Sequence, residues 1–330
     1  MITLKKYIFT NNIINKIMAI FCTLLWGTTA PAVKLMFDSL KIQNNDIPKQ
    51  IYFAGICFTL SGIFTLIVPC IKRKKLLLIN RSTITDTFLI AIMQTTLQYI
   101  FFYIGLANTS ASKASIISSF CTFFIIILSH FIYKDEKLTL QKTIGCMLGI
   151  TSMVILNLEY SQNISLDFKL LGEGFMLFSA IAIAVPTPIC KRLSFKEDVT
   201  IFTGNSFLIG GVFLILIGLL YGGNINLFST YNFCLLLYLS VSSSIAGVLW
   251  NYLLKYNEVS KISIYNLLVP IFGTLFSYII LKENIYEIKT IISLILASSG
   301  IYMVEKVSKT NKVNLKEILN KCAIKSNKNL

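Results

Sequence analysis

The chain has 330 residues, of which 55% are hydrophobic and only 14% are charged. One soluble core of that length needs far less apolar surface, so the composition excludes an ordinary soluble domain and indicates a lipid environment. The net charge of +15 matches nucleic-acid binding in its sign, but the positions of the positive residues along the chain argue against nucleic acid as a partner.

Ten long apolar runs follow one another, separated by short polar linkers. A helix needs about 20 mostly apolar residues to cross the hydrocarbon, and only helices or closed barrels satisfy every backbone group there. The runs are continuous rather than alternating, which excludes a barrel. We expect an all-α integral membrane protein with ten transmembrane helices, at 15–36, 51–71, 86–107, 111–133, 139–158, 171–191, 199–221, 231–254, 260–281 and 286–304.

Two short segments of the chain recur at nearly equal distances. Ser-Lys-Ala-Ser-Ile at 112–116 returns 148 residues later, at 260–264, with one residue changed. The proline and lysine of 31–34 return 157 residues later, at 188–191. These matches predict a duplicated chain.

The duplication predicts three parts: a five-helix repeat at 1–158, a second at 159–304 and a basic tail at 305–330. Because five is an odd number, the second repeat should enter the membrane from the opposite side. Inverted repeats of this kind are a recurrent plan of secondary transporters, with the substrate site between the halves near mid-depth. A small-molecule substrate and the lipid bilayer are therefore the expected partners.

Lysine and arginine concentrate in alternate connections. The amino terminus, the tail and the connections after the second, fourth, sixth and eighth runs contain 23 of the 30 positive residues. Positive residues collect on cytoplasmic loops, so we expect a plasma-membrane protein with both termini in the cytoplasm. The tail supports this topology and can touch anionic lipid.

The sequence offers little for metal or catalytic chemistry. It has eight cysteines, without a Cys-x-x-Cys pair, and a single histidine, His130. It contains neither His-Glu-x-x-His nor Gly-x-Ser-x-Gly. We expect no metal, no cofactor and no enzymatic activity.

Several short motifs appear in an order typical of one transporter family. They are Leu25-Trp26-Gly27-Thr28 with Pro31 and Lys34, the stretch 106–115, Ser260-Lys261-Ile262-Ser263, the stretch 268–272 and Leu281-Lys282-Glu283. With them, the chain resembles the EamA family of the drug/metabolite transporter superfamily up to about residue 304. The resemblance implies a ten-helix carrier of amino acids, nucleoside-like compounds or other small metabolites, often directed outward. Two positions depart from the family pattern: Thr122 replaces a common proline, which leaves the bend of the fourth helix open, and Asp135 replaces a glutamate.

Polar side chains inside the runs are candidates for a substrate site, because such groups are costly in lipid. The third run contains Gln94 and Gln98, which share one helical face, together with Tyr99 and Tyr103. Two interpretations stay equally open for this stripe: hydrogen bonding between helices, and the wall of a cavity.

Prolines in the first and ninth runs free a carbonyl one turn earlier, which a substrate or a neighbouring group can use. We therefore expect a cavity near Trp26 and Thr29 ahead of Pro31, and near Tyr265 and Asn266 ahead of Pro270. Trp250, late in the eighth run, is expected instead in the interfacial belt of aromatic residues.

Lys34, Lys113 and Lys261 lie near the ends of runs, where long side chains usually reach water. The alternative is that these lysines stand at the mouths of the pathway, with Lys113 and Lys261 at paired positions on opposite sides.

Acidic residues fall in the linkers or near the ends of the runs, with Glu173 the nearest to a span interior. A carboxylate for proton coupling is not evident, which favours a uniporter or substrate exchanger over a proton antiporter. We expect a secondary transporter that exports a small metabolite such as an amino acid. The alternatives are a non-transporting receptor or assembly protein and a proton-coupled multidrug carrier.

Overall fold

The computed structural model describes residues 8–73, 79–133, 138–157, 169–226 and 229–282, and isolated residues between 288 and 303. Every regular element in this part of the chain is a helix. Eight spans are long and apolar enough to cross a membrane, which confirms the all-α, multi-pass class. They are Asn12–Ser39, Ile47–Ile71, Ile84–Ala107, Ala111–Ile132, Leu170–Leu193, Val199–Leu220, Thr230–Tyr256 and Val259–Leu281.

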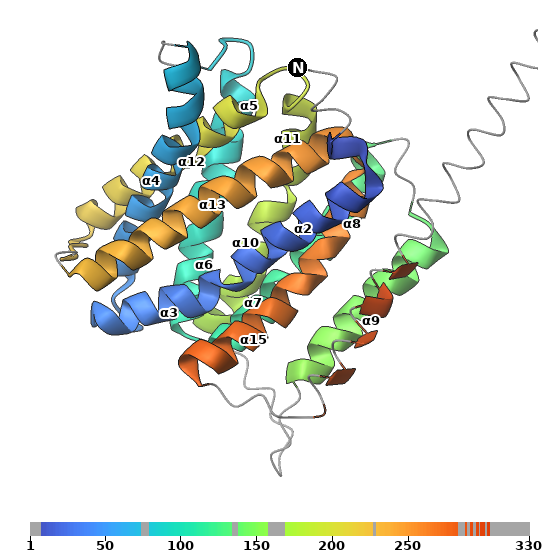
Figure 1. Ribbon diagram of the computed structural model, residues 1–330. Coiled ribbons are helices and arrows are strands. Elements are labelled where there is room, and N and C mark those ends of the chain that lie inside the picture. The colour runs from blue at the N-terminus through green and yellow to red at the C-terminus, as the bar shows by residue number, and fades with distance from the viewer. Residues whose placement is uncertain are drawn as a thin grey trace, which may run out of the picture.

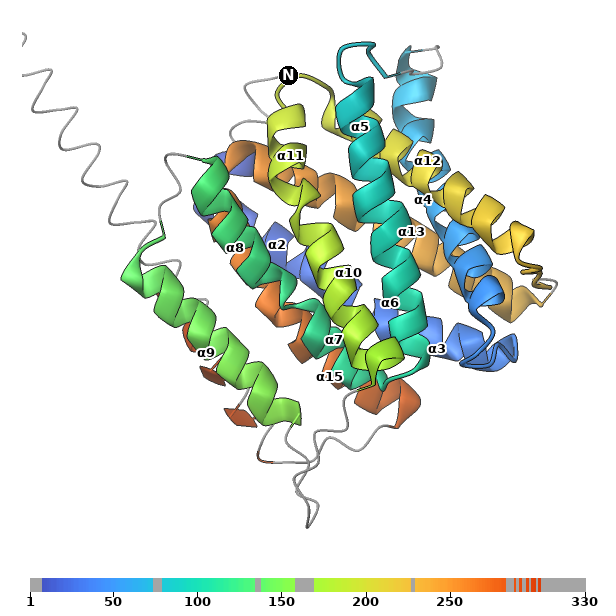
Figure 2. The ribbon, with the colours of Figure 1, turned by 180° about the vertical axis from the view of Figure 1, so that it is seen from behind.

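These spans correspond to the first four and the sixth to ninth of the expected runs. The fifth run coincides with α9 (Leu140–Asn157), which lies at the edge of the bundle in Figures 1 and 2. Most of the tenth run, 286–304, lies outside the described residues. The count of ten helices and their inverted arrangement therefore stay predictions.

Side-chain contacts show which connections share one end of the bundle. Asn15 Nδ2 donates to Asn257 Oδ1 at 3.0 Å, so the start of the chain meets the connection that follows the span Thr230–Tyr256. Lys255 Nζ donates to the carbonyl oxygen of Ser194 in the connection before Val199. We call this end the amino-terminal face.

The other end, the opposite face, has its own contacts. Ser39 Oγ donates to Asn232 Oδ1 at 2.6 Å, and Thr109 Oγ1 donates to Glu173 Oε1 at 3.0 Å.

At the start of α9, Lys142 Nζ donates to Ser260 Oγ at 3.2 Å near the amino-terminal face. When α9 is counted between Ala111–Ile132 and Leu170–Leu193, successive helices run in alternating directions, as the alternate placement of positive residues predicts.

Three uninterrupted helices, α4 (Ile47–Arg73), α12 (Val199–Leu220) and α13 (Thr230–Tyr256), pack against one another on one side of the bundle (Figure 1). Glycines bring α4 and α12 close together. A Cβ atom added at Gly55 would lie 2.5 Å from the Ile215 nitrogen, and one at Gly211 would lie 2.4 Å from the Thr59 nitrogen. Small residues permit this close approach of helices in membranes, and here they join the two expected halves.

Each of the other five spans is divided into two or three shorter helical segments. Their segments are α2 (Asn12–Gly27) and α3 (Thr29–Ser39); α5 (Ile84–Ile90), the π-helix η1 (Ala91–Leu97) and α6 (Gln98–Ala107); α7 (Ala111–Ser118) and α8 (Cys121–Ile132); the π-helix η2 (Leu170–Gly174), α10 (Phe175–Ala184) and α11 (Pro186–Leu193); and α14 (Val259–Ser263), the 3₁₀ helix η3 (Ile264–Leu268) and α15 (Val269–Leu281).

The fourth span bends without a proline. The backbone nitrogens of Ser119 and Phe120 donate to the carbonyl oxygens of Ile116 and Ile117, each at 3.1 Å. Bonds between residues three apart tighten a helix turn. Ser119 Oγ also donates to the Ile116 oxygen at 2.7 Å and competes with the regular helical bond. Thr122 in place of proline therefore does not straighten this helix.

The interruptions follow the offsets of the sequence repeat. A shift of 157 residues carries Thr28, between α2 and α3, onto Val185, between α10 and α11. A shift of 148 residues carries Ser119, between α7 and α8, onto Leu267 in η3. The spans of the first and sixth expected runs, and those of the fourth and ninth, thus break at corresponding positions, whereas the span of the third run, interrupted by η1, has the uninterrupted α13 as its counterpart.

Buried apolar side chains form two clusters. The cluster towards the amino-terminal face includes Phe9, Leu193, Phe202, Leu253 and Ile262. The cluster towards the opposite face includes Phe37, Phe53, Tyr103, Leu106 and Leu236.

Candidate functional site

A cavity lies inside the bundle, where the interrupted spans face α12 and α13. All five interrupted spans contribute residues to its wall. Its volume, measured as the space that the centre of a water molecule can occupy, is about 120 Å³. That is room for on the order of ten waters, so a small metabolite of a similar number of non-hydrogen atoms fits.

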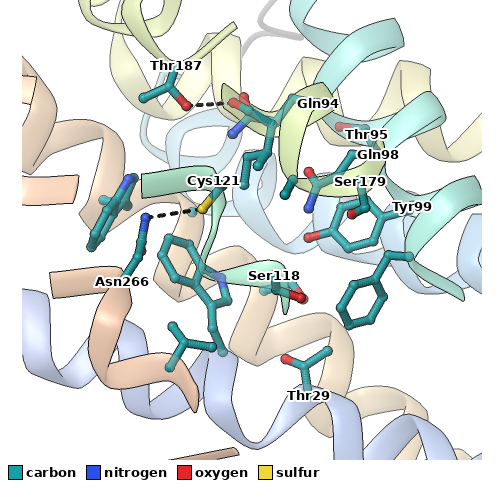
Figure 3. A pocket seen from close by; sticks show the side chains of 18 of the residues that line it. Thr29, Gln94, Thr95, Gln98, Tyr99, Ser118, Cys121, Ser179, Thr187 and Asn266 are labelled. Carbon is teal, nitrogen blue, oxygen red and sulfur yellow. Dashed lines mark hydrogen bonds between the residues drawn. The ribbon is translucent and has the colours of Figure 1, made fainter. Parts of the chain in front are cut away.

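Six of the predicted cavity residues line this space, and Figure 3 shows five of them around it. They are Trp26, Thr29, Gln94, Gln98, Tyr99 and Asn266. Three separate spans bring them together, an arrangement that no local sequence feature could predict. Contact of these residues with a substrate stays a prediction.

Tyr103, Tyr265 and Pro270 lie in packed surroundings instead of on the described cavity wall. Tyr103 is 2% exposed, and its ring centroid is 6.1 Å from that of Phe37 and 5.9 Å from that of Phe53. Tyr265 belongs to the apolar cluster towards the amino-terminal face, and Pro270 is buried at the start of α15. These residues support the packing around the cavity.

The two glutamines of the third span lie within a π-helix and directly after its end. Gln94 is within η1 and Gln98 opens α6. Gln94 Oε1 accepts a hydrogen bond from Cys190 Sγ of α11 at 3.2 Å. Gln94 therefore both forms a hydrogen bond with a neighbouring helix and lines the cavity, so both interpretations of this stripe apply to Gln94. Short π-helical turns often occur at functional sites.

The expected interfacial position of Trp250 is wrong. Trp250 is 6% exposed and lines the cavity, with its ring centroid 4.8 Å from that of Trp26 at an interplanar angle of 64°. This edge-to-face contact is a favourable aromatic geometry. Both tryptophans of the chain therefore lie at the cavity.

The sequence did not single out several other wall residues. Asn251 Nδ2 donates to Thr203 Oγ1 at 2.9 Å across α13 and α12. Asn266 Nδ2 faces Cys121 Sγ at 3.8 Å (Figure 3). Thr95 lines the cavity beside the two glutamines. Single hydroxyl, thiol and amide groups are also common in ordinary helix packing, so their presence in a run does not indicate a cavity. Among these residues, only Asn251 could have stood out in the sequence, because it directly follows a tryptophan inside a run.

The three lysines considered for the mouths are half-buried and lie away from the cavity wall. Lys113 is near the start of α7 and interacts electrostatically with Glu173 at the opposite face. Lys34 lies in α3, and Lys261 lies in α14 near the amino-terminal face. Their role at the mouths stays a prediction.

No charged side chain occurs among the described residues that line the cavity. Glu197 is 9% exposed but accepts hydrogen bonds from the Asn80 nitrogen at 3.3 Å and Thr83 Oγ1 at 3.0 Å. It therefore ties two connections together at the amino-terminal face. His130 Nδ1 accepts from the Leu138 nitrogen at 3.1 Å near the same end.

The fold and the cavity together define a multi-pass helical membrane protein with an internal cavity. A model of the EamA-like transporter family matches residues 14–158 and 170–305. The chain belongs to this family of transporters.

Two similar proteins are named as transporters. An "Uncharacterized transporter" of Archaeoglobus fulgidus is 25% identical over 285 residues, which are 84% of this chain and 94% of that protein. The "Uncharacterized transporter YoaV" of Bacillus subtilis is 25% identical over 85% of this chain and 93% of its own length. A solved structure titled "Crystal structure of protein" has a TM-score of 0.69 at 15% identity, covers 89% of this chain and 97% of that chain, and supports the fold alone.

Proposed function

We propose that the protein is a secondary transporter that exports a small metabolite, such as an amino acid, by alternating access between two inverted halves. The observation that carries this proposal is the cavity, which is walled by interrupted spans from both halves. Secondary transporters commonly bind substrate near mid-depth beside broken helices.

The two apolar clusters supply a basis for alternating access. One lies between the cavity and the amino-terminal face, and the other lies between the cavity and the opposite face. Opening one cluster while the other stays packed would expose the cavity to one side at a time. The interrupted helices make such movement easier, because their segments can tilt at the breaks.

The orientation follows from the positive residues. The connections rich in lysine and arginine gather at the amino-terminal face, so this face is assigned to the cytoplasm of the plasma membrane. Export then means loading of the cavity from the amino-terminal face and release at the opposite face.

An untargeted comparison of metabolites tests the function. Cells that overproduce the protein should release at least one small metabolite faster than cells without it, and purified protein in lipid vesicles should transport the same compound. Vesicles that show no protein-dependent flux of any compound found in this way would contradict transport and favour a receptor or assembly role.

Substitution of cavity residues tests the site. Tyr99→Ala and Asn266→Ala should each weaken transport about tenfold, the equivalent of about 1.4 kcal/mol, while the amount of folded protein stays unchanged. Transport kinetics in vesicles measure the effect, and Tyr231→Ala, at an exposed position of α13, is the matched control. Unchanged kinetics in both cavity variants would remove these residues from the site.

A further inference from the structure

Three hydroxyl groups on the cavity wall direct their protons into the protein. Ser118 Oγ donates to the Ala114 oxygen and Thr187 Oγ1 donates to the Ile183 oxygen, each at 2.7 Å. Ser119 makes the same kind of bond within its own span. These hydroxyls therefore present lone pairs, and not protons, to a ligand.

Two amides on the wall each have an acceptor that is unpaired among the described residues. Asn251 uses Nδ2 to bond Thr203. Asn251 Oδ1 and Gln98 Oε1 accept no hydrogen bond from the part of the chain that the structure describes, although the two residues are only 6% and 8% exposed. A buried acceptor without a donor destabilises the folded protein, and a ligand that donates to it removes this cost. Rotation about the last side-chain bond, which is a soft torsion, can turn Gln98 Oε1 towards a ligand, and the same rotation at Asn251 exchanges its bond to Thr203 for one to the ligand.

The described wall also offers no charge to pair with an ionic ligand. An ion moved from water into such a site loses several kcal/mol of hydration that only a partner charge or several good hydrogen bonds restore. A carboxylate would find no positive charge on the described wall and would be repelled by the two unpaired acceptors, Asn251 Oδ1 and Gln98 Oε1. A bare ammonium group would find acceptors but no counter-charge.

Flat aromatic faces complete the wall. Trp26 and Trp250 lie in contact, and Tyr99, Phe202 and Phe207 line the same space. Aromatic side chains bind planar rings by offset stacking and by edge-to-face contact.

We propose that the cavity takes an uncharged, planar molecule that carries N–H donors, such as a nucleobase or an aromatic amide. This inference rests on the proposed transport function and names the substrate class of its site. It places zwitterionic amino acids, whose two charges would meet no charged group on the described wall, behind uncharged ring compounds.

Intrinsic fluorescence tests the proposal, since both tryptophans of the chain line the cavity. The full-length protein in lipid nanodiscs is excited at a wavelength that selects tryptophan and titrated with adenine, benzamide, N,N-dimethylbenzamide, benzoate, benzylammonium and phenylalanine. Adenine and benzamide should change the emission in a saturable way. N,N-dimethylbenzamide, which has the same ring without N–H donors, should bind at least about tenfold more weakly, and the three charged probes should bind more weakly than benzamide.

Matched variants locate the binding. Gln98→Leu and Asn251→Leu should each weaken benzamide binding about tenfold, whereas Gln141→Leu, at an exposed position of α9, should leave it unchanged. Tighter binding of benzoate, benzylammonium or phenylalanine than of benzamide would overturn the proposal, and so would an absence of response to adenine and benzamide. If vesicles transport an amino acid but these uncharged probes do not bind, the transport function stands and this substrate class fails.

Discussion

Gly211→Leu is expected to prevent formation of a stable folded protein. Gly211 lies where α12 crosses α4, and even a Cβ atom there would be 2.4 Å from the Thr59 nitrogen and 2.8 Å from the Phe58 carbonyl carbon. The obstacle is backbone, which cannot rotate away as a side chain can. Overpacking usually costs about 1–3 kcal/mol, and a leucine at this contact should reach or exceed the upper value because the two helices must separate.

Size-exclusion profiles and thermal unfolding in detergent measure this effect. The matched control is Val212→Leu, one residue further along the same helix, where the native side chain is 39% exposed. We expect the control to behave as the unchanged protein and Gly211→Leu to yield aggregated or strongly destabilised material. A monodisperse Gly211→Leu variant with an unchanged melting temperature would show that α4 and α12 are not held in this close contact.

Gln98→Glu is expected to destabilise the protein at pH 8 and to do so less at pH 5. The substitution keeps the shape of the side chain but places a carboxylate in a cavity whose described wall carries no charge. Leaving an ionised group there costs several kcal/mol, which corresponds to a fall in melting temperature of roughly 5–10 °C. Acid pH favours the neutral carboxylic acid, which resembles the amide, so the difference from the unchanged protein should shrink as the pH falls.

Melting temperatures at the two pH values, each measured against the unchanged protein, give the result. Gln141→Glu on the exposed face of α9 controls for the added negative charge, and its melting temperature should follow that of the unchanged protein at both values. A Gln98→Glu variant as stable as the unchanged protein at pH 8 would mean that a cation or open water reaches Gln98, and it would contradict a charge-free cavity.

The spans were predictable because crossing the membrane requires one continuous apolar run. The first expected run, 15–36, and the observed span Asn12–Ser39 differ by three residues at each end. The internal breaks of the spans were harder to predict from the sequence. The first span is interrupted at Thr28 rather than at Pro31, and the fourth breaks at Ser119 without a proline, through bonds between residues three apart.

Gln94 and Gln98 could be found from the sequence because an amide facing lipid is costly, which leaves the interior as their only favourable location. Tyr103 could not be separated from them, although it packs against Phe37 and Phe53 and not at the cavity. Trp250 was misplaced for a related reason. Tryptophan is common both at the membrane surface and in binding sites, and only its contact with Trp26 distinguishes the two.

The sequence by itself determined the membrane class, the apolar spans, the alternation of positive connections and the short list of interior polar side chains. Each of these depends on the cost of placing a given side chain in lipid or in water. The tertiary structure decided which side chains share the cavity, where the spans break and which acceptors stay without donors. The lipid-facing and the buried faces of a membrane helix are both apolar, so hydrophobic periodicity cannot mark the inner face. Contacts between residues 96 and 224 positions apart, Gln94 with Cys190 and Trp26 with Trp250, had to be seen in the folded bundle.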